Sequence, residues 1–311
     1  MAENHKQGTM EKRAITQVQP EEKQSTLSLT MIWVGGVISA PALMVGAILM
    51  GGLSLQMTLL ITLLAFGVQV AIMSLNGIEA SDTGYPLTVI LGKTFGNTGS
   101  RYILAGLITL TQGLQAAVQI GVCGGAFVAA LGAIMSVGAG TTDLTELFVK
   151  LNMPIIGVLA LLLATWTTNT TNFYQSGLAF TRFCGAKDGK RPLLTAIIGV
   201  IATVLAVLGA LDFFVPMLNA FSVMIPPIAG IMMADYWIIG KGKKENWGII
   251  PGFNFAGIGA WIAGMAVGFF VNVFSPAFNS IVVGMIVYLI LNAALKNVTP
   301  AARNPEEFIG E

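Results

Sequence analysis

Long apolar stretches recur along the chain after a polar N-terminal segment. A helix of about 20 mainly apolar residues spans the roughly 30 Å hydrocarbon core of a bilayer. Only 10% of the 311 residues are charged, whereas soluble domains have about 25%. Because lipid offers the backbone no water to bond, each stretch is expected to be helical. The sequence therefore predicts an all-α, polytopic membrane protein.

Residues that carry most enzyme and metal chemistry are few and scattered. Cys123 lies in an apolar stretch, Cys184 in a basic loop, and the single histidine, His5, in the N-terminal segment. This pattern fits neither a disulfide framework nor a metal site of His and Cys. No paired carboxylates are placed for acid–base catalysis, and no basic block resembles a nucleic-acid-binding patch. We therefore expect no enzyme activity, no cofactor and no nucleic-acid partner.

The polar loops divide into basic and non-basic ones. Lys and Arg are concentrated in the two tails and in residues 76–101, 182–191 and 241–244. The positive-inside rule places these segments in the cytoplasm. The prediction is a multi-pass protein of the cell (inner) membrane, with both termini inside and about eight transmembrane helices. The apolar block 102–140 exceeds one ordinary span, and a single over-long crossing is its simplest interpretation.

Residues 1–28 are polar and are expected to form a disordered cytoplasmic tail, with a second tail at 297–311. Between them, residues 29–296 form the transmembrane domain. Residues 86–96 predict a short amphipathic helix at the membrane interface. Asp235 precedes Tyr236 and Trp237, a pair typical of an interfacial aromatic belt, so it is interpreted as a boundary residue. Pro226–Pro227 is expected to interrupt its helix.

A dense polar cluster lies within residues 161–173, LLLATWTTNTTNF. Thr hydroxyls can bond to the carbonyl one turn earlier, and this would account for one or two of them. The whole run of Thr and Asn is too long for that explanation alone. Polar side chains at membrane depth face protein, an ion or a solute. The cluster therefore predicts half of a binding site.

Two further features lie in the first and third apolar stretches. The first contains Gly35, Gly36 and Ser39-Ala40-Pro41, which predicts either a broken helix with free carbonyls or a packed proline kink. The third contains Gln112, Gln115 and Gln119, spaced so that they share one helical face. Such a stripe faces a cavity or a neighbouring helix more often than lipid.

Three segments together carry a family resemblance: LTMIWVGGVISAP, TWTTN followed by YQSGL, and IPPIAGIMMADY. Across most of residues 27–296 the chain resembles the cytosine permeases of the nucleobase–cation symporter family. The resemblance implies a LeuT-like, inverted-repeat transporter fold of twelve helices, two inverted repeats of five helices plus two more. It also implies cation-coupled uptake of a nucleobase by alternating access.

The chain departs from that family pattern in one large way. Residues 29–122 resemble family helices one to three, and residues 132–296 resemble the end of helix seven through helix twelve. Helices four to six and part of seven are missing, so the prediction is a LeuT-like fold with an internal deletion. Family helices three and seven both run from inside to outside, so their joining within 102–140 preserves the topology.

The resemblance also implies two sets of site residues. A sodium ion would lie between the first helix and the eighth family helix, and oxygen ligands suit this hard cation. Its expected ligands are the carbonyls of Gly35, Ile38 and Ala164 and the hydroxyls of Thr167 and Thr168. The expected substrate-binding residues are Gln112, Gln115, Ser39 and Asn169, although Gln115 and Ser39 stand where cytosine permeases carry aromatic residues.

Two hypotheses follow from this comparison. In the first, the protein takes up cytosine or a related purine or pyrimidine with sodium or a proton as the coupling ion. In the second, it is an internally deleted, transport-inactive relative that acts at most as a packing partner in the membrane. Both hypotheses make the lipid bilayer its surroundings, and neither predicts an oligomeric state.

Overall fold

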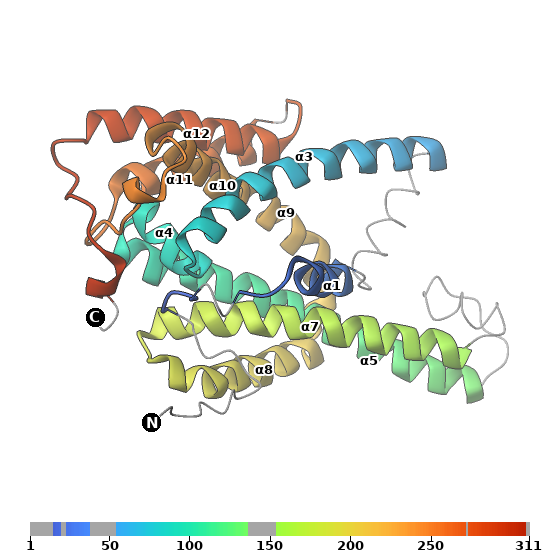
Figure 1. The fold of residues 1–311 in the computed structure, drawn as a ribbon. Coiled ribbons are helices and arrows are strands. Elements are labelled where there is room, and N and C mark those ends of the chain that lie inside the picture. The colour runs from blue at the N-terminus through green and yellow to red at the C-terminus, as the bar shows by residue number, and fades with distance from the viewer. Residues whose placement is uncertain (1–14, 20–22, 38–53, 136–153, 272, 309–311) are drawn as a thin grey trace, which may run out of the picture.

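The fold is taken from a computed structural model that describes residues 15–19, 23–37, 54–135, 154–271 and 273–308 (Figure 1). All regular secondary structure in these residues is helical. The helices are α1 (Thr26–Val37), α3 (Leu55–Thr83), α4 (Leu87–Phe95), α5 (Ala105–Met135), α7 (Pro154–Cys184), α8 (Arg191–Val207), α9 (Phe214–Met224), α10 (Pro226–Met233), α11 (Phe255–Phe270) and α12 (Pro276–Ala294). Shorter helical elements are the π-helices η2 (Gly99–Leu104) and η5 (Ala234–Ile239) and the 3-10 helices η3 (Asp188–Lys190), η4 (Ala210–Phe213), η6 (Lys244–Asn246) and η7 (Pro305–Phe308).

Two groups of helices make up the described fold. In one group α5 packs against α7 and α8, and α1 lies against α7 (Figure 1). In the other group α10, α11 and α12 pack together with α4, and their main hydrophobic core includes Phe95, Leu104, Ile231 and Tyr288. Helix α3 extends away from both groups along most of its length (Figure 1).

Several helices are long and apolar enough to cross a membrane, which supports a polytopic membrane protein. Five such stretches occur among the described residues: Leu55–Thr83, Gly99–Gly121, Asp188–Val207, Ala210–Ile239 and Pro276–Ala294. The block 102–140 is helical from η2 through α5 to Met135, without a turn. Its interpretation as one long helix therefore holds as far as the described residues reach.

The break predicted at Pro226–Pro227 is confirmed. Helix α9 ends at Met224 and α10 begins at Pro226, because a proline has no amide hydrogen to donate to the preceding turn. The carbonyl of Met224 instead accepts a hydrogen bond of 2.8 Å from the Trp261 indole of α11. In a regular helix the Ile228 amide would donate to this carbonyl, but here it donates to the Ile225 carbonyl. A side chain from a neighbouring helix thus satisfies a backbone group that is freed at the break.

Helix α4 corrects the prediction of an amphipathic helix at the membrane interface. Every residue from Thr88 to Phe95 is buried. Ile249 packs directly over Gly92, and α10 and α11 cover other parts of the helix. Helix α3 also continues into the predicted loop 76–101 and stops at Gly84, whose φ of +70° suits a glycine C-cap.

Part of the N-terminal segment is ordered against the helices, so the prediction of a disordered tail is wrong for these residues. The Val18 amide donates to the Gly84 carbonyl at 2.9 Å, and the Gln17 side-chain amide donates to the Thr83 carbonyl at 2.8 Å. These bonds occupy carbonyls at the C-terminal end of α3. Residues 1–14 lie outside the described part.

Candidate functional site

The glutamines of α5 and the polar cluster of α7 meet at one helix–helix interface. The two helices lie side by side and run in opposite directions (Figure 1). The Gln112 amide donates to the Gln175 side-chain oxygen at 3.0 Å. Because both helices rise about 1.5 Å per residue, Gln119, seven residues further along α5, lies near the level of Thr168 on α7.

A buried polar stripe runs along α7 at this interface. Its buried members, Thr165, Thr168, Asn172 and Ser176, are spaced three, four and four residues apart, which places them on one face of the helix. Several side-chain atoms in and beside this stripe have no hydrogen-bonding partner within the described protein: Thr165 Oγ1, Asn169 Oδ1 and Asn172 Nδ2. These hydroxyl and amide groups are therefore available to a bound solute.

Gln119 is a fully buried polar residue of the interface between α5 and α7. Its side chain is completely buried, and neither its amide oxygen nor its amide nitrogen has a partner in the described structure. A buried polar group without a partner costs about 1–3 kcal/mol, so this residue is a costly choice for helix packing alone. Its amide offers one acceptor and two donors, the pairing pattern with which a planar heterocycle can be recognised.

The outward-facing Thr residues of α7 are explained without a ligand. The Thr170 hydroxyl donates to the Trp166 carbonyl at 2.8 Å, and the Thr171 hydroxyl donates to the Thr167 carbonyl at 3.3 Å. These are the bonds to the preceding turn that polar residues make in membrane helices. The sequence cluster thus divides into a buried stripe and an outer face whose hydroxyls bond to their own backbone.

The structure places only some of the expected sodium ligands. Gly35 lies in α1, which packs against α7, and Ala164 lies in α7; Ile38 lies outside the described residues. Thr168 is buried and Thr167 is exposed, because adjacent residues of a regular helix point about 100° apart. Helix α7 is regular here, and the sodium site itself stays a prediction.

The expected substrate residues are also only partly brought together. Gln112 and Gln115 are half-buried on α5, and Asn169 is half-buried on α7. Ser39 lies outside the described residues. Gln119 was predicted only as part of the glutamine stripe, yet its burial makes it the strongest candidate. Its spacing from Gln112 and Gln115 indicated in the sequence that it shares their helical face.

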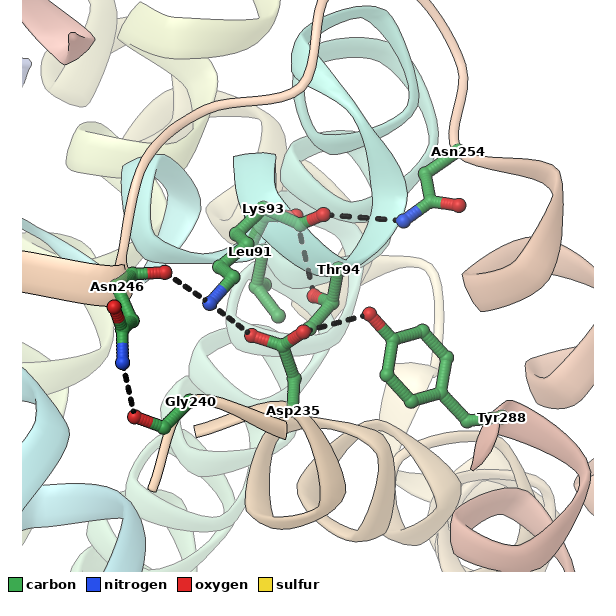
Figure 2. Close-up of polar contacts among 8 residues, drawn as sticks. All are labelled: Leu91, Lys93, Thr94, Asp235, Gly240, Asn246, Asn254 and Tyr288. Carbon is green, nitrogen blue, oxygen red and sulfur yellow. Dashed lines mark hydrogen bonds and ion pairs between the residues drawn. The ribbon is translucent and has the colours of Figure 1, made fainter. Parts of the chain in front are cut away.

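A second polar cluster was missed entirely by the sequence analysis (Figure 2). The Lys93 ammonium of α4 lies 3.0 Å from Asp235 Oδ2 at the start of η5. The Tyr288 hydroxyl of α12 donates to the other carboxylate oxygen at 2.9 Å, and Lys93 also donates to the Asn246 carbonyl at 2.7 Å. Asp235 is therefore a buried partner of Lys93, and its position at the membrane boundary stays a prediction.

The acidic end of α3 lies beside this second cluster. Glu79 is 1% exposed, and its Oε2 atom has no hydrogen-bonding partner in the described structure. The Tyr236 hydroxyl donates to Asp82 Oδ2 at 2.5 Å, so Tyr236 is a buried tether to α3 and not part of a lipid-facing aromatic belt. The missed signal was the presence of charged residues in apolar helices, which usually have partners.

Comparison with known proteins gives the family. The sequence matches the model of a family described as permeases for cytosine/purines, uracil, thiamine and allantoin, in two segments that cover residues 17–149 and 103–292. The chain belongs to this permease family. The two matched segments overlap in residues 103–149, and α5 forms much of that overlap.

Individual relatives of this permease family member are also known. The chain is 31% identical to the cytosine permease of Escherichia coli strain K12 over 173 residues, which cover 55% of this chain and 40% of the relative. The cytosine permeases of E. coli O6:H1 and E. coli O157:H7 match to the same extent. The chain thus spans less than half the length of the relatives that it matches.

Proposed function

We propose that this family member takes up a nucleobase, cytosine or a related purine or pyrimidine, by alternating access coupled to a cation. The observation that carries the proposal is the buried polar interface between α5 and α7. In it the unpartnered amide of Gln119, in an otherwise apolar part of α5, lies near the level of the Thr168 hydroxyl on α7. Family membership supplies the substrate class, because the matched relatives are named cytosine permeases.

The coupling ion is proposed to be sodium or a proton. For sodium, the Thr168 hydroxyl and carbonyls of α1 are the proposed ligands, because α1 packs against the same helix that bears Thr168. Oxygen atoms are the ligands that this hard cation prefers. Thr167 points away from the buried stripe in this conformation, so its participation would require a rotation of α7.

One observation favours the alternative of a transport-inactive relative. The matched relatives are longer, with only 40% of their length covered. Helix α3 buries only Thr58, Glu79 and Thr83 within the described structure, and the overlap of the two matched family segments fits a join within α5. In this alternative the missing helices would have supplied the rest of the pocket, and the chain would only pack against other membrane helices.

Uptake by membrane vesicles distinguishes the two proposals. Vesicles containing the full chain are given labelled cytosine under an inward sodium gradient or an inward proton gradient. We expect uptake above that of empty vesicles, and we expect Gln119→Leu to reduce it at least about tenfold because a lost buried contact costs more than about 1.4 kcal/mol. Uptake no higher than in empty vesicles under both gradients would establish the inactive alternative.

Two Thr variants test the ion site in the same assay. Thr168→Ala removes the buried hydroxyl and is expected to raise the sodium concentration needed for half-maximal uptake by about tenfold. Thr170→Ala is the control, because its hydroxyl is exposed and bonds only to the Trp166 carbonyl. An unchanged sodium requirement in Thr168→Ala would remove this residue from the ion site.

A further inference from the structure

A separate pocket of about 320 Å³ lies beyond the polar stripe, at the C-terminal end of α7. Its walls come from segments far apart in sequence: residues 15–16, the start of η2, the last turn of α7 with the loop that follows it, and Phe308 of η7. Pockets that hold small molecules range over roughly 300–1,000 Å³. The pocket is therefore large enough for a single small polar group.

Basic side chains dominate the pocket wall. Arg101, Arg182 and Lys187 line it, together with one carboxylate, Asp188, to which the Thr16 hydroxyl donates at 3.0 Å. Among the described residues of the wall, three positive charges thus face one negative charge. An anion entering this pocket would improve the charge balance, whereas a cation would meet net repulsion.

Arg182 is the buried element of this wall. It is only 5% exposed, and one of its terminal nitrogens donates to the Asn97 side-chain oxygen. Its Nε atom has no hydrogen-bonding partner, and no carboxylate in the described part of the chain pairs with its guanidinium. A buried charge without a counterion is costly, so this arginine has capacity for an anionic ligand.

Arg101 is held in place by two local features. Its guanidinium lies 5.0 Å from the centre of the Tyr102 ring, a cation–π contact. The same guanidinium fills the space where a side chain at position 185 would begin, and Gly185 has a φ of +62°. Only glycine therefore permits both this backbone turn and this close approach.

We propose that this pocket binds a phosphate group, carried by an anionic phospholipid headgroup or by a small phosphate compound. Two guanidinium groups and an ammonium group around one pocket match the charge and geometry of phosphate, which arginine binds through paired N–H donors. The basic loops around the pocket are those predicted to face the cytoplasm, where anionic headgroups attract Lys and Arg.

The test uses the purified full chain and two probes. For the lipid source, the chain is reconstituted in nanodiscs of phosphatidylcholine alone or mixed with phosphatidylglycerol, and native mass spectrometry counts the lipids that stay bound. For the free source, inorganic phosphate is titrated onto the chain in a neutral detergent with chloride as the competing anion. Retention of phosphatidylglycerol assigns a headgroup, and saturable phosphate binding alone assigns a free phosphate compound.

Matched lysine variants separate the pocket from a general charge effect. Lys187 and Lys190 are both exposed and lie three residues apart, but only Lys187 lines the pocket. We expect Lys187→Gln to weaken binding about threefold and Arg101→Gln about tenfold, with Lys190→Gln unchanged. Equal losses from the two lysine variants, phosphate binding no stronger than chloride binding, or no binding of either probe would overturn the proposal.

Discussion

The Lys93 ammonium is a charge that the fold must compensate, because its side chain is only 9% exposed. Asp235 supplies the opposite charge, and Asn246 and Tyr288 complete the hydrogen bonds of the pair (Figure 2). Replacing a buried ion pair by apolar residues is often neutral, whereas removing one partner leaves a charge buried alone. The pair therefore makes α4 depend on η5 and α12.

This dependence predicts the effect of Asp235→Asn. The variant leaves the Lys93 charge without its counterion and is expected to destabilise the protein by roughly 3–5 kcal/mol. The measurement is the midpoint of thermal unfolding in detergent, with Asp212→Asn as a control at an exposed carboxylate. The double variant Lys93→Met with Asp235→Leu should recover most of the loss. If it is no more stable than Asp235→Asn, charge compensation is not what the pair provides.

Some polar side-chain clusters could be located from the sequence, and others could not. The Thr and Asn cluster and the glutamine stripe could be located because helical spacing within one segment fixes which residues share a face. The Lys93–Asp235 pair could not be located, because its two members are far apart in sequence and only tertiary packing joins them. Lys93 matched the pattern of an amphipathic interfacial helix, and Asp235 matched that of a residue beside an interfacial aromatic belt.

At the scale of elements, close helix packing decides how α4 is placed. A Cβ added at Gly257 of α11 would lie 1.8 Å from the Thr94 carbonyl oxygen of α4. The Asn254 side chain at the start of α11 also donates to the Lys93 carbonyl at 3.2 Å (Figure 2). The side chains of Lys93 and Thr94 thus bond inside the protein, which allows an amphipathic sequence to form a buried helix.

Gly257→Ala tests this contact. The added methyl group must push α11 away from the backbone of α4, and we expect a loss of about 1–3 kcal/mol in stability. Gly77→Ala is the matched control, since nothing lies within 4 Å of a Cβ at that position in α3. Alanine favours a helix over glycine by about 1 kcal/mol, so the control should unfold at the same or a higher temperature. Equal midpoints for the two variants would contradict the close contact.

The break in the helix before Pro226 could be predicted from the sequence, but its tertiary contacts could not. Proline chemistry alone located the break between α9 and α10. The partner of the freed carbonyl, the Trp261 indole, comes from another helix, and no local pattern identifies it. The same limit applies to α7, where the composition of the segment located the Thr and Asn cluster but did not identify α5 as the helix that packs against it.

At the scale of the whole molecule, the loops predicted to face the cytoplasm gather at one end. The Asn97 amide bonds to the Ile250 carbonyl at 2.7 Å, and the Arg303 amide bonds to the Ile249 carbonyl at 2.8 Å. Thr16 reaches Asp188 in the loop after α7. These contacts connect segments that the charge distribution alone assigned to one side, so packing and the positive-inside rule agree.

Cys184 offers a direct measurement of which side of the membrane this end faces, because it is an exposed free thiol at the C-terminal end of α7. In a Cys123→Ala background, a membrane-impermeant maleimide should label Cys184 in inside-out vesicles and not in intact cells, because the basic loops are predicted to face the cytoplasm. In the control protein, Cys184→Ser removes the first thiol and Asp212→Cys introduces one in the non-basic element η4. This thiol should be labelled in intact cells and not in inside-out vesicles. Labelling of Cys184 in intact cells, with position 212 protected there, would invert the topology and place the phosphate pocket on the outer face.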